Sequence, residues 1–295
     1  MADYVDFYSS LEHATNLGRM FRPGSEPLLP NWRRLPVGYH GRSSTVVVSG
    51  TPIRRPVGQR PGPEGPTWGP SRRLDIELEL AFVTGAAANA LGEPIPIDRA
   101  AQRIFGFLLL NDWSARDIQA WEYQPLGPFL GKSFATSVSP WVVPLEALES
   151  YRVAGPAQDP EPFAYLRSDE PWGLDIEFEV SLAVDGREPH TIARTNAREL
   201  YWTPVQQLAH AASNGAIVRA GDLYASGTIS GREPGSQGSL IELTWNGERP
   251  LELDGATRTF LEDGDAVTIT GRTPDGLIEF GAVSGAIVSA GSEGD

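Results

Sequence analysis

The chain contains no cysteine and comparatively few basic side chains. Without cysteine it can have no disulfide bond, no thiolate metal site and no cysteine nucleophile. Its 24 lysine and arginine residues are outnumbered by 38 acidic residues, which gives a formal net charge of −14. A surface this acidic disfavours nucleic acid and anionic membranes, so we expect neither as a binding partner.

Long hydrophobic runs and targeting signals are also missing. The longest apolar stretch near the centre lies within "IFGFLLL" at 104–110, whereas a membrane-spanning helix needs about 20 such residues. The first ten residues, "MADYVDFYSS", lack the basic segment and the apolar segment of a secretory signal. We therefore expect a cytoplasmic protein, whose 40% apolar residues are enough for a large core.

Lysine is nearly absent as well. Lys132 stands alone, and the other 23 basic residues are arginine (24 − 1). An ammonium group is a compact point charge and a guanidinium is a planar fork, so the two are not interchangeable in a binding site. Either the single lysine is an accident of composition, or it lies in a site that needs a compact cation.

Short alternating segments separated by glycine and proline dominate the rest of the pattern. With 32 glycines and 25 prolines, most periodic segments are brief. Short alternating or continuously apolar runs predict β-strands at 44–50, 74–83, 106–110, 139–145, 174–184, 239–245, 266–271 and 281–288. The Pro/Gly-rich segment 54–73 is expected to be a loop.

Helices are few in this pattern. They are predicted from Ser10, from Asp98, over 113–123 and from Thr203, where Gln206 completes a capping box. Parallel βαβ repetition is absent, so the sequence favours a mainly β or α+β fold with a few short helices.

Two segments alternate apolar and acidic residues in the same way. They read "LDIELEL" at 74–80 and "LDIEFEV" at 174–180. On a strand, Asp75, Glu77 and Glu79 would share one face, where like charges repel unless water or a cation lies between them. The pattern by itself does not say which of the two strands, if either, carries chemistry.

Other acids and one histidine add to the candidate site. Asp6, Asp112 and acids of 74–80 could form an all-oxygen cluster, which suits hard cations such as Mg²⁺ or Ca²⁺. Asp112 follows a buried strand, so it is either the cap of the next helix or a ligand. His13 lies close to Asp6 in the sequence and is a candidate general base. The tripeptide "GKS" at 131–133 lacks the earlier glycine of a phosphate loop, which excludes that motif.

Five longer segments resemble the fumarylacetoacetate hydrolase family over nearly the whole chain. They are "DFYSSLEHATNLGRMFR", "LPNWRRLPVGYHGRSSTVVVSGTPIRRP", "LDIELELAF", "NDWSARDIQAWEYQPLGPFLGKSFATSVSPWVVP" and "GDLYASGTISG". The resemblance implies a mixed β-sandwich roll with a few short helices. It also implies that 1–295 is a single catalytic domain and that the small N-terminal β-barrel domain of the family is absent.

The activity implied by the resemblance is metal-dependent hydrolysis of a carbon–carbon bond. The substrate would be 4-fumarylacetoacetate, a small anionic diketo acid, and the products fumarate and acetoacetate, at the end of tyrosine and phenylalanine degradation. Mg²⁺ or Ca²⁺ would be the cofactor and a homodimer the assembly. The alternatives are another acylpyruvate or β-diketone hydrolase, a decarboxylase of the same superfamily, or an inactive β-rich binding homologue.

The resemblance also assigns roles to individual residues. It implies a metal site at the first acidic strand rather than the second, with four carboxylate ligands: Asp6, Glu77, Glu79 and Asp112. A secondary metal position is implied at Lys132 and Thr136. Catalytic roles are implied for His13 as general base, Glu242 as the acid that orients it, and Arg116, Gln119 and Lys132 around the oxyanion. The implied substrate contacts are Tyr8, Arg22, Tyr39, Tyr123 and Thr228.

Overall fold

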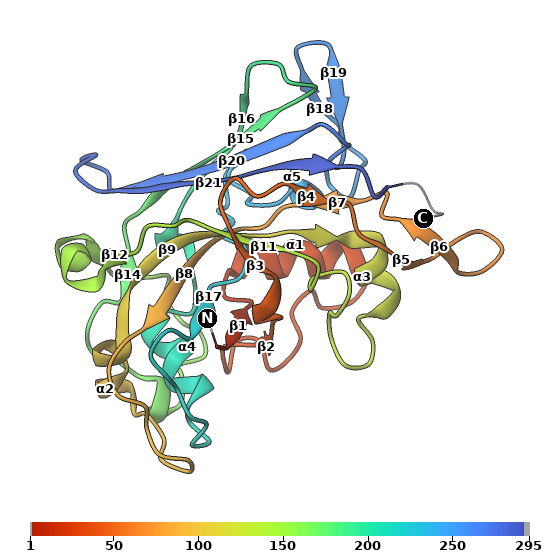
Figure 1. Cartoon of the computed structure of the whole chain (residues 1–295). Coiled ribbons are helices and arrows are strands. Elements are labelled where there is room, and N and C mark those ends of the chain that lie inside the picture. The colour runs from red at the N-terminus through yellow and green to blue at the C-terminus, as the bar shows by residue number, and fades with distance from the viewer. Residues whose placement is uncertain (1, 292–295) are drawn as a thin grey trace.

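Two β-sheets organise the chain in the computed structural model, which describes residues 2–291 (Figure 1). The larger sheet has eight strands and mixes parallel with antiparallel pairs. In spatial order its strands are β2 (Gly38–His40), β1 (Tyr4–Phe7), β17 (Leu223–Ala225), β8 (Leu78–Thr84), β9 (Ile104–Asp112), β11 (Thr136–Val138) and β3 (Val46–Val48), with β12 (Val143–Pro144) also paired to β9.

The second sheet has five strands and runs across the top of the view in Figure 1. Its order is β16 (His190–Asn196), β15 (Glu177–Ala183), β20 (Ala266–Arg272), β21 (Glu279–Val288) and β4 (Ile53–Arg54). The two sheets share one hydrophobic core, in which Leu109 of β9 and Phe178 of β15 are buried. A side chain at Gly271 would lie only 2.9 Å from Leu109, so glycine there lets the sheets approach closely.

Short hairpins and helices complete the fold. The two-stranded pairs are β5 (Val57–Arg60) with β6 (Thr67–Pro70), β7 (Leu74–Asp75) with β10 (Ser114–Ala115), β13 (Arg152–Val153) with β14 (Gly173–Leu174), and β18 (Leu251–Leu253) with β19 (Ala256–Arg258). The α-helices are α1 (Leu11–Phe21), α2 (Ile97–Ala100), α3 (Arg116–Glu122), α4 (Pro204–Ala211) and α5 (Leu240–Leu243). Five short 3₁₀ segments are η1 (Ser43–Thr45), η2 (Ala101–Arg103), η3 (Leu145–Tyr151), η4 (Ala164–Leu166) and η5 (Ala197–Glu199).

The predicted fold class is confirmed, and so are the principal helices. Helix α1 follows Ser10, whose hydroxyl accepts a hydrogen bond from the backbone N–H of His13. Helix α4 has the expected capping box between Thr203 and Gln206 and begins with proline. Within residues 2–291, no helix is long and apolar enough to cross a membrane.

The predicted strand at 239–245 is wrong, because this segment forms helix α5. A short apolar run is ambiguous between strand and helix, and its tertiary neighbours decide. Here the carboxylate of Asp75 accepts hydrogen bonds from the backbone N–H groups of Leu240 and Ile241, which favours a helical start. Trp245 and Asn246 then take positive φ values of 48° and 61° and end the helix.

Three further expectations need correction. The strand expected at 74–83 is broken after Asp75. At the break, the backbone N–H of Glu77 donates a hydrogen bond to the side-chain oxygen of Asn111 and not to a backbone carbonyl of the sheet. The segment 54–73 is not a plain loop, because β5 and β6 pair within it at Gly58 and Gly69, where glycine leaves space. Of the strand expected at 139–145, only Val143–Pro144 pairs with the sheet.

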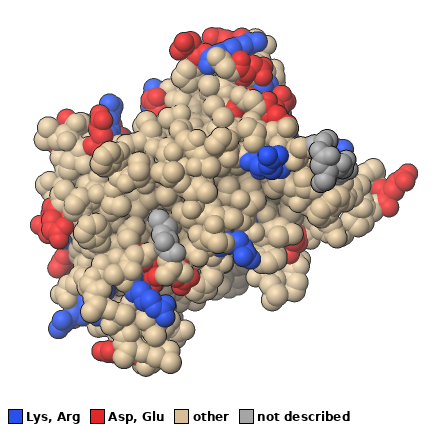
Figure 2. Space-filling model, viewed as in Figure 1, with Lys and Arg blue, Asp and Glu red and all other residues tan. Residues whose placement is uncertain are grey.

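Charged side chains are unevenly spread over the face shown in Figure 2. They gather at the margins, including the top, where the β18–β19 hairpin projects in Figure 1. The broad central area of this face shows few of them. For a chain with a formal net charge of −14, this area is unusually poor in charge.

Candidate active site

Three carboxylates from separate segments meet beside the larger sheet. Asp6 lies on β1, Glu79 on β8 and Asp112 at the end of β9, and β17 alone separates β1 from β8. One oxygen from each of the three side chains lies within 4.8 Å of the others. All three residues are at most 1% exposed. Strand order in the sheet, rather than proximity in the sequence, therefore assembles this cluster.

The donor set fits a hard divalent cation. Oδ1 of Asp6 and Oε1 of Glu79 are buried and have no hydrogen-bond partner within residues 2–291. Burial raises the pKa of Asp6 and that of Glu79, and the neighbouring carboxylates raise both pKa values further. Unpaired, crowded carboxylate oxygens are what Mg²⁺ or Ca²⁺ would neutralise, so these residues suit such an ion.

Asp112 is a member of the cluster and does not cap the next helix. Helix α3 has Ala115 as its N-cap and no side-chain cap. The Oδ2 atom of Asp112 instead accepts hydrogen bonds from Tyr39 at 3.2 Å and from Nζ of Lys132 at 2.7 Å. Thr136, which lies opposite Asp112 in the register of β11 and β9, donates a weaker hydrogen bond at 3.4 Å to Oδ1. The capping alternative is thereby excluded.

Glu77 lies beside the three carboxylates but not among them. Its Oε1 atom is 2.7 Å from Nη1 of Arg116, and its Oε2 atom is 2.5 Å from Nζ of Lys132. Burial raises the pKa of Glu77, but the two cations outweigh it and hold that pKa below its ordinary value. Two of the acids that the alternating pattern places on one face thus have opposite electrostatic environments.

The single lysine of the chain lies in the site and is buried. Lys132 is 7% exposed and its ammonium group bridges Glu77 and Asp112. Burial lowers the pKa of Lys132, but these carboxylates outweigh burial and raise it above its usual value. The ammonium group therefore stays charged. Composition had left two interpretations of this residue open, and its position supports the one that places it in a site.

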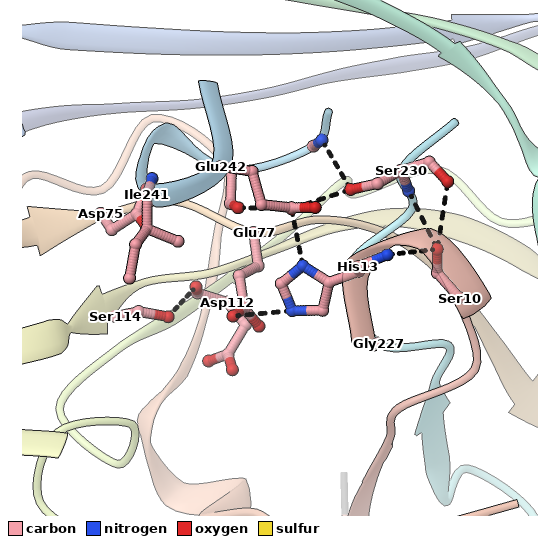
Figure 3. Close-up of polar contacts among 12 residues, drawn as sticks. Ser10, His13, Asp75, Glu77, Asp112, Ser114, Gly227, Ser230, Ile241 and Glu242 are labelled. Carbon is pink, nitrogen blue, oxygen red and sulfur yellow. Dashed lines mark hydrogen bonds and ion pairs between the residues drawn. The ribbon is translucent and has the colours of Figure 1, made fainter. Parts of the chain in front are cut away.

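His13 and Glu242 form a buried pair across 229 residues of sequence (Figure 3). Nδ1 of His13, on α1, is 2.6 Å from Oε2 of Glu242, on α5. Burial raises the pKa of Glu242, but His13 and hydrogen-bond donors outweigh it and lower that pKa. An ionised carboxylate only accepts hydrogen bonds, so Nδ1 donates. In a neutral ring Nε2 is then left unprotonated, 3.9 Å from Oε1 of Glu77.

Three more residues hold the carboxylate of Glu242, and the sequence analysis missed them. Asn16 donates to Oε1 at 2.9 Å, and the hydroxyls of Ser230 and Ser239 donate to Oε2 at 2.9 and 2.7 Å. Asn16 follows His13 by three positions on a helix, and that spacing places both on one face, which was an available signal. Ser239 is the N-cap of α5 and Ser230 lies outside helices and strands, and neither position carries a comparable sequence signal.

A cavity of about 410 Å³ is lined by His13 of this pair and by Asp6 of the carboxylate cluster. Ten of the sequence-predicted site residues line it: Asp6, Tyr8, His13, Arg22, Tyr39, Glu77, Arg116, Gln119, Tyr123 and Lys132. Apolar side chains, among them Leu17, Leu28 and Trp32, complete its wall. Thr228 is not part of that lining, although it follows Gly227, whose backbone N–H donates to Glu79.

The cavity wall offers two buried cationic donors. Nη2 of Arg116 and Nε of Arg22 are buried and unpartnered among the described residues. Another nitrogen of Arg22 donates to the carbonyl oxygen of Pro27 at 2.6 Å, which ties the side chain to its loop. A buried donor without an acceptor is costly, so both positions favour an anionic ligand. The cavity wall therefore combines an imidazole, the carboxylates of Asp6 and Glu77, and cationic side chains.

The second acidic strand has none of these neighbours. Glu179 of β15 pairs with Arg194 at 2.7 Å, and Glu177 lies 3.5 Å from Arg272. The side chains of Glu177 and Glu179 are 46% and 38% exposed. The acids of this strand therefore lie on a partly solvated face.

Sequence comparison shows which known proteins this chain is similar to. The family model described as "Fumarylacetoacetate (FAA) hydrolase C-terminal" matches residues 4–288. The chain is 56% identical to fumarylacetoacetase of Rattus norvegicus, over 98% of this chain and 70% of the rat protein. It is 54% identical to fumarylacetoacetase of Arabidopsis thaliana, over 98% of this chain and 69% of the plant protein.

Solved structures with low sequence identity share the fold. Fumarylpyruvate hydrolase from Pseudomonas aeruginosa, solved with Mn²⁺ and pyruvate, superimposes with a TM-score of 0.58 at 18% identity. The match covers 98% of this chain and 90% of that chain. Fumarylacetoacetate hydrolase from Exiguobacterium antarcticum gives a TM-score of 0.59 at 17% identity, over 97% of this chain and 75% of that one.

Proposed function

This chain belongs to the fumarylacetoacetate hydrolase family, and from that premise we propose that it hydrolyses a carbon–carbon bond of 4-fumarylacetoacetate. The products are fumarate and acetoacetate. The observation that carries the proposal is that the His13–Glu242 pair and the carboxylate cluster reach the same cavity, through His13 and Asp6. A base, a cation site and anion-binding groups are what hydrolysis of a dianionic diketone requires.

His13 acts as the general base in this proposal. Glu242 holds its Nδ1 proton, so the unprotonated Nε2 takes a proton from water. The water oxygen bonds to the carbonyl carbon, and the electron pair of the broken carbon–carbon bond passes to the leaving enolate. That enolate then takes the proton that His13 removed from water and becomes acetoacetate, which leaves His13 neutral again. Because the pair is buried, bulk water does not compete for these hydrogen bonds.

Two cationic side chains and one amide stabilise the oxyanion that forms. Arg116, Gln119 and Lys132 line one part of the cavity and carry this role. Arg22, with Tyr8, Tyr39 and Tyr123, binds the distal carboxylate of the substrate. Thr228 stays a predicted substrate contact, supported by its position beside Gly227 and by a buried hydroxyl without a partner in residues 2–291. An acidic protein thus processes an acidic substrate, since its site reverses the sign of the local field.

Asp6, Glu79 and Asp112, with Glu77 as fourth ligand, would hold the divalent cation. We propose Mg²⁺ or Ca²⁺, because every donor is a hard oxygen. When bound, the cation supplies positive charge that stabilises a developing enolate. Lys132 and Thr136, which both contact Asp112, stay the predicted secondary metal position.

Assembly and location complete the proposal. We propose a homodimer in the cytoplasm. The charge-poor central area of the face in Figure 2 supports an association between copies of the chain, since charged residues are depleted at the core of protein interfaces. Size measurement by light scattering tests the dimer.

Turnover of the purified chain tests the function directly. The chain is mixed with 4-fumarylacetoacetate and, separately, with fumarylpyruvate, and the products are identified by proton NMR. Fumarate and acetoacetate formed at a higher kcat/KM than the products of fumarylpyruvate are expected. A preference for fumarylpyruvate would assign the chain to acylpyruvate hydrolysis. No turnover of either compound, with Mg²⁺ or Ca²⁺ supplied, would overturn the proposal and leave another β-diketone hydrolase, a decarboxylase or an inactive binding homologue.

A further inference from the structure

We propose that Asp75 is a positioning residue for this reaction. It holds the guanidinium of Arg116 in one orientation and ties it to helix α5, which carries Glu242. The inference rests on the proposed function, because it explains how Arg116 and Glu242 keep fixed positions relative to each other in that site. Asp75 is the one acid of the 74–80 segment to which neither the cation site nor the oxyanion gives a role, and it is 0% exposed.

The first half of the argument is the geometry of Arg116. Its Nε donates to Oδ2 of Asp75 at 2.8 Å, and its Nη1 lies 2.7 Å from Oε1 of Glu77. A guanidinium is planar and rigid, so fixing two of its nitrogens fixes the third. That third nitrogen, Nη2, is buried in the cavity wall without a partner among the described residues. Two acids of one short segment therefore fix the orientation of a guanidinium that lines the cavity and has one nitrogen without a partner.

The second half is the hydrogen bonding of the same carboxylate to α5 (Figure 3). The backbone N–H of Leu240 donates to Oδ1 of Asp75 at 2.7 Å, and that of Ile241 donates to Oδ2 at 3.1 Å. Glu242 is the next residue along the helix. One side chain thus connects the proposed oxyanion donor with the acid that orients His13. Displacing Asp75 would disturb both groups together.

A purely structural role is the competing explanation, and the chain offers a matched control. Asp265 is also 0% exposed, and its Oδ2 accepts from Nε of Arg258 at 2.9 Å and from the backbone N–H of Glu262 at 2.8 Å. These residues do not line the cavity. Asp265→Asn removes the same kind of charge as Asp75→Asn, so it reports the cost of losing a buried Asp–Arg pair.

Kinetics of four proteins and the control test the proposal. Asp75→Asn, Arg116→Lys, the double variant, the unchanged chain and Asp265→Asn are compared, with metal content and thermal midpoint measured in each. We expect Asp75→Asn to lower kcat by about 10²-fold, the scale of losing one oxyanion donor. In the Arg116→Lys background the same change should cost less than about 3-fold, because residues that act as a unit are not additive. Asp265→Asn should lower the thermal midpoint but change kcat less than about 2-fold.

A readout without turnover separates this inference from the proposed function. In ¹⁵N-arginine-labelled chain, the Nε–H resonance of Arg116 is assigned by its loss in Arg116→Lys. We expect slow exchange with water in the unchanged chain and in Asp265→Asn, and fast exchange in Asp75→Asn. If the unchanged chain hydrolyses nothing, the function fails and this exchange rate still tests whether Asp75 holds Arg116.

Two results would overturn the inference. One is full multiplicative loss of kcat in the double variant, which would mean that Asp75 acts apart from Arg116. The other is an Nε–H that stays protected in Asp75→Asn. Should Asp75→Asn fail to fold, Asp75→Glu replaces it in both measurements, because it keeps the charge and moves it by one methylene.

Discussion

The segments 74–80 and 174–180 carry nearly the same letters and fold in nearly the same way. Each begins with a two-residue pairing, β7 or β14, and continues after a break into a longer strand, β8 or β15. Yet the acids of the first segment are at most 6% exposed, whereas the side chains of Glu177 and Glu179 are more than a third exposed. An alternating acidic pattern is therefore compatible with either a buried site or a wet surface.

Neighbouring strands and helices account for the difference. Strand β8 lies between β17 and β9 in the larger sheet, and the acids of this segment meet Asp6, Asp112 and Lys132 from other parts of the chain. Strand β15 is flanked by β16 and β20, which present arginines to its acids. Exposed pairs of that kind contribute little to stability. What a row of carboxylates does is decided by the residues it faces.

The largest expected effect separates the two segments directly. Glu77→Gln combined with Glu79→Gln should remove the bound divalent cation, about one per purified chain, and abolish turnover, since two of the hard oxygen ligands are lost. Metal analysis and kcat are the measurements. Glu177→Gln combined with Glu179→Gln is the matched control and should change neither. If the second variant loses its metal and the first does not, the metal site lies on the 174–180 segment and the assignment to 74–80 is wrong.

The next effect tests the pair that faces the first segment. His13→Ala should lower kcat by about 10²–10⁴-fold, the usual cost of losing a general base, with little change in metal content. Glu242→Gln should cost less, because it acts through His13. The double variant should be hardly worse than His13→Ala. If the two losses multiply in full, the two side chains work separately and do not form a water-activating pair.

A smaller effect is expected at the lysine that bridges two acids of the site. Lys132→Arg should lower kcat by roughly 10²-fold, because a planar guanidinium does not fit between Glu77 and Asp112 as a compact ammonium does. The comparison is kcat at saturating substrate and metal. A kcat close to that of the unchanged chain would make the single lysine an accident of composition.

The smallest effect is expected on the second strand. Slight burial raises the pKa of Glu179, but hydrogen bonds from Thr191 and Arg194 outweigh it and lower that pKa. Folding therefore favours the ionised carboxylate, and this stabilises the folded chain at pH values above the pKa of a glutamate in the unfolded chain. Glu179→Gln should lower the free energy of unfolding at pH 7 by less than about 1 kcal/mol.

The stability lost in Glu179→Gln should depend on pH, and the lowered pKa of Glu179 fixes the direction of that dependence. A lowered pKa in the folded state contributes stability above the unfolded pKa, and this contribution disappears as the pH falls through the folded pKa. Urea unfolding at pH 7 and at pH 3 measures it. The gap between the unchanged chain and Glu179→Gln should shrink at the lower pH. A gap that widens instead would mean that Arg194 does not stabilise the carboxylate.

Several features of this protein follow from its sequence because they depend on local chemistry. The capping box at Thr203 and Gln206 predicts α4, and period-two alternation predicts β20 and β21. The lone Lys132 signals a special position by composition. The acids and His13 were candidates from residue type, and the family resemblance adds the other site residues. Ten of all these predicted site residues, Lys132 among them, line one cavity.

Tertiary structure decided what alternation and composition leave open. The segment 239–245 has the pattern of a strand but forms a helix. The reason is that the carboxylate of Asp75 accepts hydrogen bonds from the first backbone N–H groups of the helix, and Asp75 lies 165 positions away from Leu240. Only strand order brings Asp6, Glu79 and Asp112 together, and only the contacts with Arg116 and Lys132 separate Glu77 from them. A sequence pattern records which face a side chain occupies. The charge and burial of that face depend on distant segments of the chain. Those segments decide which carboxylates form a cluster suited to a cation and which ones face water.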